Sequence, residues 1–390
     1  MKKFLRNFFI LFVSVLILGK GIHLLSGMIS TNKSSENESE NIENSSGVSS
    51  FTFMGVGDNL IHEAIYYYWT DGNNYDAMYK PIKKYTKETD LSYINYETIC
   101  AGEELELSGY PTFNGPLEIN DAVSHAGFDW LSLCSNHAYD RGKDGIITSL
   151  DYIEKLNKKI TVTGSYRSKK ESNTPQVIEI NGIKVGITSY TYGLNGFTLP
   201  EDEQWMINLI DKNQIKKDMK KLNEVSDVQI VSMHWGDEYQ NTPSSFQKKY
   251  AKLLNECGVD VIIGTHPHVI QPVEWIHGDK QDTLCYYSLG NFISEQDEVE
   301  RMIGGMARFT VEYDFNNEEV TIKEPSFTPT ITYYNPNYSG ATSYAMPEWN
   351  DELAEKTFFA ARGDDISKEA VANYVKEVVG NPEGIEVVLK

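Results

Sequence analysis

The side chains of this chain that could bind a metal ion gather in short motifs that follow apolar, strand-like runs. Four of the eight histidines lie in three such motifs: Ser135-Asn136-His137, His234-Trp235-Gly236 and Gly264-Thr265-His266-Pro267-His268. Two further apolar runs end at Asp58 and Glu97. Strand ends meet at one edge of an α/β sheet, so imidazole, amide and carboxylate ligands would converge there. The pattern predicts a metal centre of the two-metal hydrolase kind.

His266 and His268 are the most specific part of this pattern. The proline between them fixes the backbone, so both rings would be presented from a rigid turn. We interpret them as a pair of metal ligands. His137 would point into the same cleft if its neighbour Asn136 is a ligand, and it then suits a general acid.

The other candidates have ordinary explanations when each is taken singly. Asp58 could cap a helix, Glu97 could be a surface acid, Asn136 a turn residue and His234 a core histidine bonded to a carbonyl. Their joint occurrence at successive strand ends favours a shared site over these separate explanations.

The elements that would position these residues alternate between strands and helices. Strand-like runs occur at residues 51–56, 91–96, 130–134, 160–163, 228–233 and 259–264, and helical stretches at residues 120–126, 146–155, 214–223 and before Gly258. Such alternation predicts an α/β fold. Asn181-Gly182 separates two β-rich runs and supplies the positive φ of a type I′ hairpin turn, so the sheet is expected to be mixed.

The amino terminus has the pattern of an export segment. Lys2, Lys3 and Arg6 precede an apolar run at residues 8–19, and a weaker apolar run at 22–29 follows Lys20. Both runs together are long enough to cross a bilayer. A cleaved signal and a retained anchor both fit, and the lack of a small-x-small site favours a single-pass membrane anchor over residues 1–29. The positive-inside rule then places the body of the protein outside the cytoplasm.

Composition suggests where the folded part begins and ends. Residues 30–50 are Ser, Asn and Glu with almost no apolar side chains, which predicts a disordered tether. A folded domain is expected over residues 51–334. Residues 335–390 are expected to be a C-terminal helical extension with two amphipathic helices, at 351–362 and 367–379, that pack on the domain.

Charge and cysteine content narrow the class of protein. A net charge of −21 and a pI near 4.8 argue against nucleic acid as a partner, because a phosphate binder needs a basic stripe and none is present. The four cysteines, Cys100, Cys134, Cys257 and Cys285, lack CxxC spacing. We expect them to be buried free thiols.

Together the motifs resemble the poly-γ-glutamate capsule synthesis proteins called CapA or PgsA, distant relatives of the calcineurin-like metallophosphoesterases. The resemblance covers roughly residues 51–292. It rests on Gly57-Asp58-Asn59-Leu60-Ile61-His62, Asn95-Tyr96-Glu97-Thr98, Tyr110-Pro111-Thr112-Phe113-Asn114, Ser135-Asn136-His137-Ala138-Tyr139-Asp140-Arg141-Gly142, His234-Trp235-Gly236-Asp237-Glu238-Tyr239, Gly264-Thr265-His266-Pro267-His268-Val269-Ile270-Gln271 and Tyr287-Ser288-Leu289-Gly290-Asn291-Phe292.

The resemblance implies a fold and a set of ligands. The fold would be a four-layer α/β/β/α sandwich with mixed sheets. The implied ligands are Asp58 and His268 for one metal and Asn136, His234 and His266 for the other, with Glu97 as the bridge. One or two divalent ions, Mn, Fe or Zn, would suit this nitrogen and oxygen set.

The resemblance also implies catalytic roles, and it has one departure. His137 would be the acid, and Asp140 and Glu238 would orient histidines. Phosphoesterases place a histidine two residues after the first aspartate, where this chain has Leu60. His62 either replaces that ligand or is an ordinary polar residue over the sheet, and in both cases the first metal site is expected to be weaker.

The function that the resemblance implies is synthesis or export of an anionic poly-γ-glutamate polymer by a membrane-tethered protein with a hydrolase-type metal site. Expected partners are the polymer or another anionic polymer, the membrane through the N-terminal segment, and capsule synthase subunits. Two alternatives stay open. The protein could be an extracytoplasmic phosphoesterase with an unrelated substrate, or a non-catalytic scaffold of a polymer synthase complex.

Overall fold

Two β-sheets form the centre of the computed structural model, which describes residues 47–69, 71–72, 74–156, 160–337 and 340–390. The first, a 9-stranded sheet, has the order β14-β13-β12-β1-β2-β3-β4, with β11 paired to β1 and β15 paired to β13. Its strands are β1 Val48–Asn59, β2 Leu91–Asn95, β3 Trp130–Ser132, β4 Thr161–Thr163, β11 Asn291–Ile293, β12 Ile303–Asp314, β13 Glu319–Tyr333, β14 Thr342–Ala345 and β15 Glu386–Val387. The second, a 6-stranded sheet, has the order β5-β6-β7-β8-β10-β9. Its strands are β5 Gln176–Ile180, β6 Ile183–Thr191, β7 Val228–His234, β8 Val261–Thr265, β9 Val273–His277 and β10 Asp282–Tyr286.

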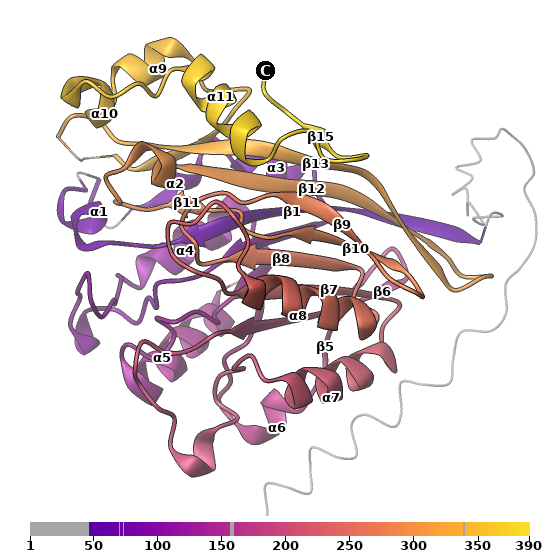
Figure 1. The fold of residues 1–390 in the computed structure, drawn as a ribbon. Coiled ribbons are helices and arrows are strands. Elements are labelled where there is room, and N and C mark those ends of the chain that lie inside the picture. The colour runs from indigo at the N-terminus through magenta and orange to yellow at the C-terminus, as the bar shows by residue number, and fades with distance from the viewer. Residues whose placement is uncertain (1–46, 70, 73, 157–159, 338–339) are drawn as a thin grey trace, which may run out of the picture. The chain divides into compact units, whose positions relative to one another are not determined.

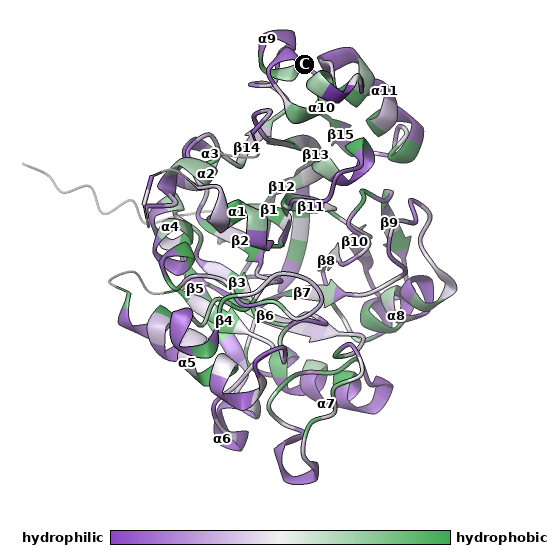
Figure 2. Cartoon of the chain, turned by 90° about the vertical axis from the view of Figure 1, so that its left-hand side faces the viewer, coloured by the Kyte–Doolittle hydropathy of each residue, from purple (hydrophilic) through white to green (hydrophobic). Residues whose placement is uncertain are grey.

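Helices cover the outer faces of both sheets (Figure 1). They are α1 Glu63–Tyr67, α2 Asp76–Tyr79, α3 Lys83–Lys87, α4 Glu118–Ala126, α5 Gly142–Lys155, α6 Lys169–Ser172, α7 Lys212–Asn223, α8 Ser245–Glu256, α9 Asp351–Glu355, α10 Phe358–Arg362 and α11 Lys368–Val378, with short 3-10 turns η1 Glu103–Leu105, η2 Glu201–Glu203 and η3 Val299–Met302. Figure 2 shows purple and green residues together on the helices, as amphipathic helices require. The predicted α/β/β/α sandwich with mixed sheets is confirmed.

Side chains of the second sheet alternate between two cores. Val231 and Met233 of β7 pack under α7 and α8, whereas Val228 and Ile230, at the alternate positions, face the first sheet and join the main core. Period-2 alternation of this kind follows from strand geometry. Burying each large apolar side chain contributes about 1.5–3 kcal/mol, so a strand buried on both faces is firmly held.

The hairpin predicted at Asn181-Gly182 is confirmed. Strands β5 and β6 pair antiparallel, and Asn181 and Gly182 have φ of 52° and 83°. Helix α4 ends at Gly127 with φ of 100°, a left-handed conformation that glycine adopts at no steric cost. The four cysteines are free thiols, and three of them are buried.

The chain ends differ from expectation. Strand β1 begins at Val48, so residues 48–50, expected in the tether, are paired with β12. The predicted helix over 351–362 is wrong as one unit, because Thr357 has extended φ and ψ and caps a new helix by accepting the Ala360 N–H. The segment beyond residue 335 also adds β14 and β15 to β13, so it belongs to the sheet rather than forming helices alone.

The predicted anchor over residues 1–29 and most of the predicted tether lie outside the described residues. Within the described ranges, none of the helices is both long and apolar enough to cross a membrane.

Candidate metal centre

The predicted ligands meet at the edge where the parallel strands of both sheets end. Strands β1, β2 and β3 run parallel to one another, as do β6, β7 and β8, so their carboxyl ends share an edge. Six buried residues come from these ends: Asp58, Glu97, Asn136, His234, His266 and His268. The structure therefore brings together side chains that are scattered in the sequence.

A polar seam between the two sheets sets the register of the site. The Tyr93 hydroxyl lies 2.6 Å from Ser232 Oγ, and two residues further along both strands Asn95 Nδ2 lies 3.2 Å from His234 Nδ1. Asn95 Nδ2 also donates to Asp58 Oδ1 over 2.8 Å. One amide thus links the first carboxylate of the site to the histidine that ends β7.

Glu97 lies at the centre of this group with an unpartnered carboxylate. It is 0% exposed, and neither of its oxygens accepts a hydrogen bond from the described residues. Its Oε1 lies 3.6 Å from His234 Nε2 and 3.8 Å from His268 Nε2. Burial, and next the charge of Asp58, raise the pKa of Glu97. A buried charge without a partner is costly, so the site fits a cation.

The atoms that would hold this cation are close together. One ligand atom each of Glu97, His266 and His268 lies within 4.8 Å of the other two. His266 Nδ1 is buried and has no hydrogen-bond partner among the described residues. Three converging lone pairs of nitrogen and oxygen are a donor set that Mn, Fe or Zn accepts.

His234 and His266 are kept neutral, as metal ligands must be. Burial, and then the neighbouring histidines, lower the pKa of both. His234 Nδ1 lies 3.1 Å from Thr265 Oγ1 and is close to the Asn95 amide. Its Nε2 lies 2.7 Å from the Asn136 amide oxygen and 3.6 Å from Glu97 Oε1, so these three ligand atoms face the same space.

His268 is held by the opposite side of the site. Its Nδ1 lies 3.0 Å from Asn291 Oδ1 and 3.5 Å from Asp58 Oδ2, which leaves Nε2 facing Glu97. Burial acts to lower the pKa of His268, but the Glu97 and Asp58 carboxylates outweigh it and raise the pKa to about 9. His268 therefore carries the charge that partly offsets Glu97 when no cation is bound.

The His-Pro-His turn is strained as well as rigid. His266 and His268 have φ of 95° and 59°, in the left-handed region that residues other than glycine seldom adopt. The backbone N–H of His266 donates to Asp58 Oδ2 over 3.2 Å, which helps to hold this conformation. Strain of this kind persists only where the surroundings enforce it, and it is concentrated at functional sites.

His137 and Asp140 form a pair beside the cluster. His137 Nδ1 lies 2.7 Å from Asp140 Oδ2, which also accepts the Phe113 N–H over 2.6 Å. The carboxylate thus fixes the proton on Nδ1 and leaves Nε2 available. Asn195 Nδ2 lies 3.3 Å from that Nε2, and the Phe113 ring packs edge-on against His137.

Leu60, which stands where a ligand histidine was expected, is 2% exposed. His62 is absent from the Glu97, His266 and His268 cluster. Its Nδ1 lies 3.1 Å from the Leu60 carbonyl oxygen and 3.3 Å from the Glu295 backbone nitrogen. Burial lowers the pKa of His62 to about 4. Glu238, expected to orient a histidine, is exposed.

Sequence reasoning missed several residues that hold the ligands. Asn95 and Asn291 stand inside motifs already noted, and a polar residue within an otherwise apolar run was the available signal. Asn195 follows β6 in a segment with no motif, although it contacts both Asn136 and His137. Tyr192, 40% exposed, tilts over His266 with ring centroids 4.5 Å apart.

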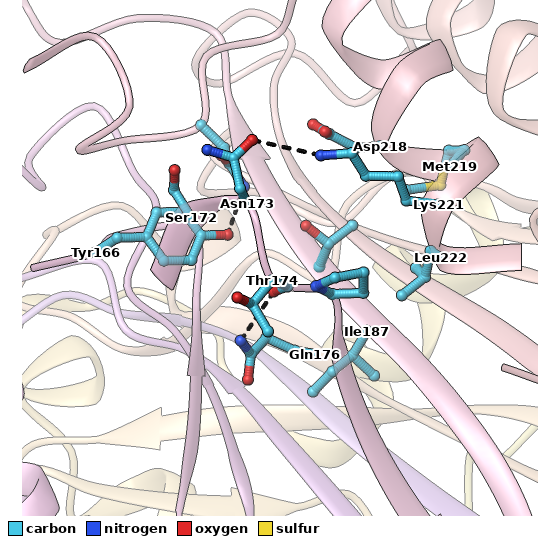
Figure 3. A pocket seen from close by; sticks show the side chains of 13 residues that line it. Tyr166, Ser172, Asn173, Thr174, Gln176, Ile187, Asp218, Met219, Lys221 and Leu222 are labelled. Carbon is cyan, nitrogen blue, oxygen red and sulfur yellow. Dashed lines mark hydrogen bonds between the residues drawn. The ribbon is translucent and has the colours of Figure 1, made fainter. Parts of the chain in front are cut away.

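A second hollow lies away from this centre, between α6, β5, β6 and α7 (Figure 3). Its lining includes no predicted ligand. Its polar groups already have partners: Asn208 Nδ2 donates to the Tyr166 hydroxyl over 2.9 Å, and Gln214 Nε2 donates to Asp218 over 2.7 Å. Although it is a well-formed pocket, we assign the chemistry to the buried centre, where ligand atoms are unpartnered.

Comparisons with known proteins agree with the motifs. Residues 52–296 match the family described as bacterial capsule synthesis protein PGA_cap. The PGA biosynthesis protein CapA of Bacillus subtilis (strain 168) is 32% identical over 179 residues, 43% of this chain and 43% of that protein. The capsule biosynthesis protein CapA of Bacillus anthracis is 28% identical over 231 residues, 57% of this chain and 54% of that protein. The chain thus spans about half the length of these curated relatives.

Among solved structures, this chain is similar to one described as a novel phosphatase of Mycoplasma pneumoniae. The TM-score is 0.43 at 17% identity, and the match covers 72% of this chain and 94% of that one.

Proposed function

This chain belongs to the PGA_cap family of bacterial capsule synthesis proteins, and from that membership and the geometry of its centre we propose that it acts in capsule synthesis as a metal-dependent hydrolase. Its substrate would be poly-γ-glutamate or another anionic polymer of the cell surface. The names of the two Bacillus relatives support the capsule role. The hydrolase role is supported by the site.

The observation that carries the hydrolase role is the Glu97 carboxylate, which is fully buried, accepts no hydrogen bond from the described residues and faces three imidazoles. A buried acid with a purely structural role normally accepts hydrogen bonds from nearby donors. One that keeps its lone pairs free beside the neutral His234 and His266 fits a divalent cation. Asp58 and Asn136 are placed to complete its ligand set.

The chemistry divides between the cation and the protein side chains. A bound divalent cation would supply charge to polarise the scissile group and to lower the pKa of a water molecule. His137, with its Nδ1 proton held by Asp140, would act as the imidazolium and deliver its Nε2 proton to the leaving atom, becoming neutral. Asn195 and Tyr192 border the same space and would exclude water and orient the substrate.

We also propose that residues 1–29 anchor the protein and that the body faces the extracytoplasmic side. The basic flank followed by apolar runs supports this arrangement. Capsule synthase subunits would then be its partners at the membrane.

The test is hydrolysis by the purified full chain, stripped with a chelator and reloaded with Mn, Fe or Zn. Substrates are a chromogenic phosphodiester and poly-γ-glutamate. Activity should return with metal and fall at least about a hundredfold in His234→Ala. His277→Ala is the matched control, because His277 is exposed and pairs only with Asp282 at the surface. Turnover of neither substrate under any metal would overturn the hydrolase proposal.

The scaffold alternative has one observation in its favour, the apolar Leu60 at a position where the related enzymes carry a ligand. The scaffold and the enzyme can be distinguished in cells that lack the native gene and express the double variant His266→Ala with His268→Ala. Wild-type amounts of capsule polymer would favour a scaffold, whereas loss of polymer at unchanged protein level would favour the enzyme.

A further inference from the structure

One arginine near the centre, Arg301, has a guanidinium without a hydrogen-bonded partner among the residues that the structure describes. Arg141 donates to main-chain carbonyls, Arg167 pairs with three acids, and Arg362 pairs with Asp297 and Asp364. In the described part of the chain, the guanidinium groups of Arg301 and Arg308 have neither an ion pair nor a hydrogen bond.

Arg301 is tied to the metal centre by two contacts. Its guanidinium lies 3.9 Å from the centroid of the Tyr239 ring, and that ring lies 5.9 Å from the ring of His268. Asn291 provides the second link, because its side chain donates to the Arg301 carbonyl over 2.8 Å and contacts His268 Nδ1. One residue, Tyr239 on one side and Asn291 on the other, therefore separates Arg301 from the candidate ligand His268.

Backbone and side-chain contacts hold Tyr239 in its position between Arg301 and His268. It has φ of 61°, its backbone N–H donates to the Pro267 carbonyl over 2.7 Å, and its hydroxyl accepts from Gln296 Nε2 over 3.3 Å. The ring is 40% exposed. A strained, partly exposed tyrosine joined to the His-Pro-His turn is placed as a platform at the rim of the centre.

The Arg301 guanidinium lies over the Tyr239 ring, and its N–H groups have no hydrogen-bonded partner among the described residues. A guanidinium packed on an aromatic ring uses its face, whereas its N–H groups point outward in the plane. Those N–H groups match the two oxygens of a carboxylate or phosphate. A lysine amine at this position would offer a point charge but not the pair of parallel N–H donors.

We propose that Arg301 is a substrate-positioning residue that binds one anionic group of a polyanion while the neighbouring unit lies at the metal centre. This inference rests on the proposed function and specifies its substrate as a chain with repeated oxyanions rather than a singly charged ester. It also resolves how an acidic protein could hold an acidic polymer, because the contact is made by a cation that no acid of the described chain neutralises.

The test compares Arg301→Ala, Arg301→Lys and Arg308→Ala in the full, metal-loaded protein. Arg308 is the matched control, since its guanidinium is also unpaired but lies over Tyr85, 5.5 Å from the ring centroid. The affinity for a fluorescent γ-linked glutamate oligomer is measured by anisotropy. Arg301→Ala should weaken the affinity about tenfold, because one charge-assisted contact is lost. Arg301→Lys should recover part of that affinity. Arg308→Ala should leave the affinity unchanged.

Two further measurements separate a positioning role from a structural one. Metal content should be equal in all variants, and the ratio of kcat/KM for the oligomer to kcat/KM for a singly charged phosphodiester should fall about tenfold in Arg301→Ala alone. Equal losses for both substrates, or lost metal, would overturn the proposal, as would equal effects of Arg301→Ala and Arg308→Ala.

The binding assay does not require turnover, so failure of the hydrolase proposal would leave this result readable. A parallel titration with polyphosphate identifies the oxyanion. Tighter, Arg301-dependent binding of polyphosphate supports the role of Arg301 and assigns phosphate as the group that it binds. Binding of both polymers without dependence on Arg301 overturns the role.

Discussion

Two buried carboxylates at opposite ends of strands show how this molecule treats structural and functional acids differently. Asp260 directly precedes β8, and its two oxygens accept from the Gln229 N–H at 2.8 Å and from Gln281 Nε2 at 3.2 Å. Glu97 follows the end of β2, and its oxygens accept from none of the described donors. Burial raises the pKa of both, that of Asp260 to about 7.

The two acids differ in whether their carboxylate oxygens are free to bind a ligand. Donors on both oxygens let Asp260 join the start of β8 to β7 and to the turn before β10, which stabilises the sheet. Glu97 gains no such bonds, and its burial lowers stability unless a cation binds. Asp260, at the amino-terminal end of β8, therefore serves the fold, whereas the carboxyl-terminal strand ends carry the candidate ligands.

The largest expected effect comes from Glu97→Gln, which removes the unpaired charge. Metal-dependent activity should fall at least about a hundredfold, and the thermal stabilisation that saturating metal gives the wild type, about 2.7 kcal/mol at a hundred times Kd, should disappear. In chelator the variant should be as stable as the wild type or more so. Activity assays across a metal titration measure the first effect, and calorimetric unfolding with and without metal measures the second.

Asp260→Ala provides the contrast to this variant. Because it removes the acceptor of two hydrogen bonds and leaves the buried Gln229 N–H unpaired, it should lose about 1–3 kcal/mol with or without metal. A Glu97→Gln variant that is equally destabilised in chelator would contradict the distinction between the two acids.

An intermediate effect is expected from Asp140→Asn, which keeps the side-chain shape but no longer fixes the His137 proton on Nδ1. For an ester with a poor leaving group, kcat should fall about tenfold to a hundredfold. For an activated nitrophenyl ester, which needs little help from an acid, the loss should be smaller. Equal losses for both esters would argue against His137 as the proton donor.

The smallest effect is the pH dependence contributed by Asp260. Its folded pKa of about 7 lies above the unfolded value near 3.9, so the folded state holds a proton that the unfolded state releases. The stabilisation is complete below about pH 4 and is lost as pH rises through about 7. Urea unfolding at several pH values should show this decline in the wild type and its absence, relative to the wild type, in Asp260→Asn.

Much of the fold could be predicted because burial leaves a direct pattern in the sequence. Strands β2, β7 and β8 are buried at every position and therefore appear as apolar runs. The hairpin followed from Asn181-Gly182. The C-terminal segment could not be predicted in this way, because β14 and β15 are short strands at the margin of a sheet whose pairing depends on distant β13.

The centre was predictable where chemistry is concentrated in motifs, and not where it depends on contacts between segments. His266 and His268 could be recognised in the sequence because Pro267 stands between them. Asn195 and Arg301 could not, because nothing in their local sequence distinguishes them from loop residues. Only the folded chain shows that one touches His137 and that the other lies over Tyr239.

The contact between Asp58 and the backbone of His266 joins residues separated by 208 positions in the chain. A nascent polypeptide lacks this junction until the strands of both sheets are in place, since loop closure over such a span comes late. Cation uptake would therefore report completed folding. If the chain crosses a membrane before it folds, it would mature into a metalloprotein only on the far side, and the ion available there would decide which metal it carries.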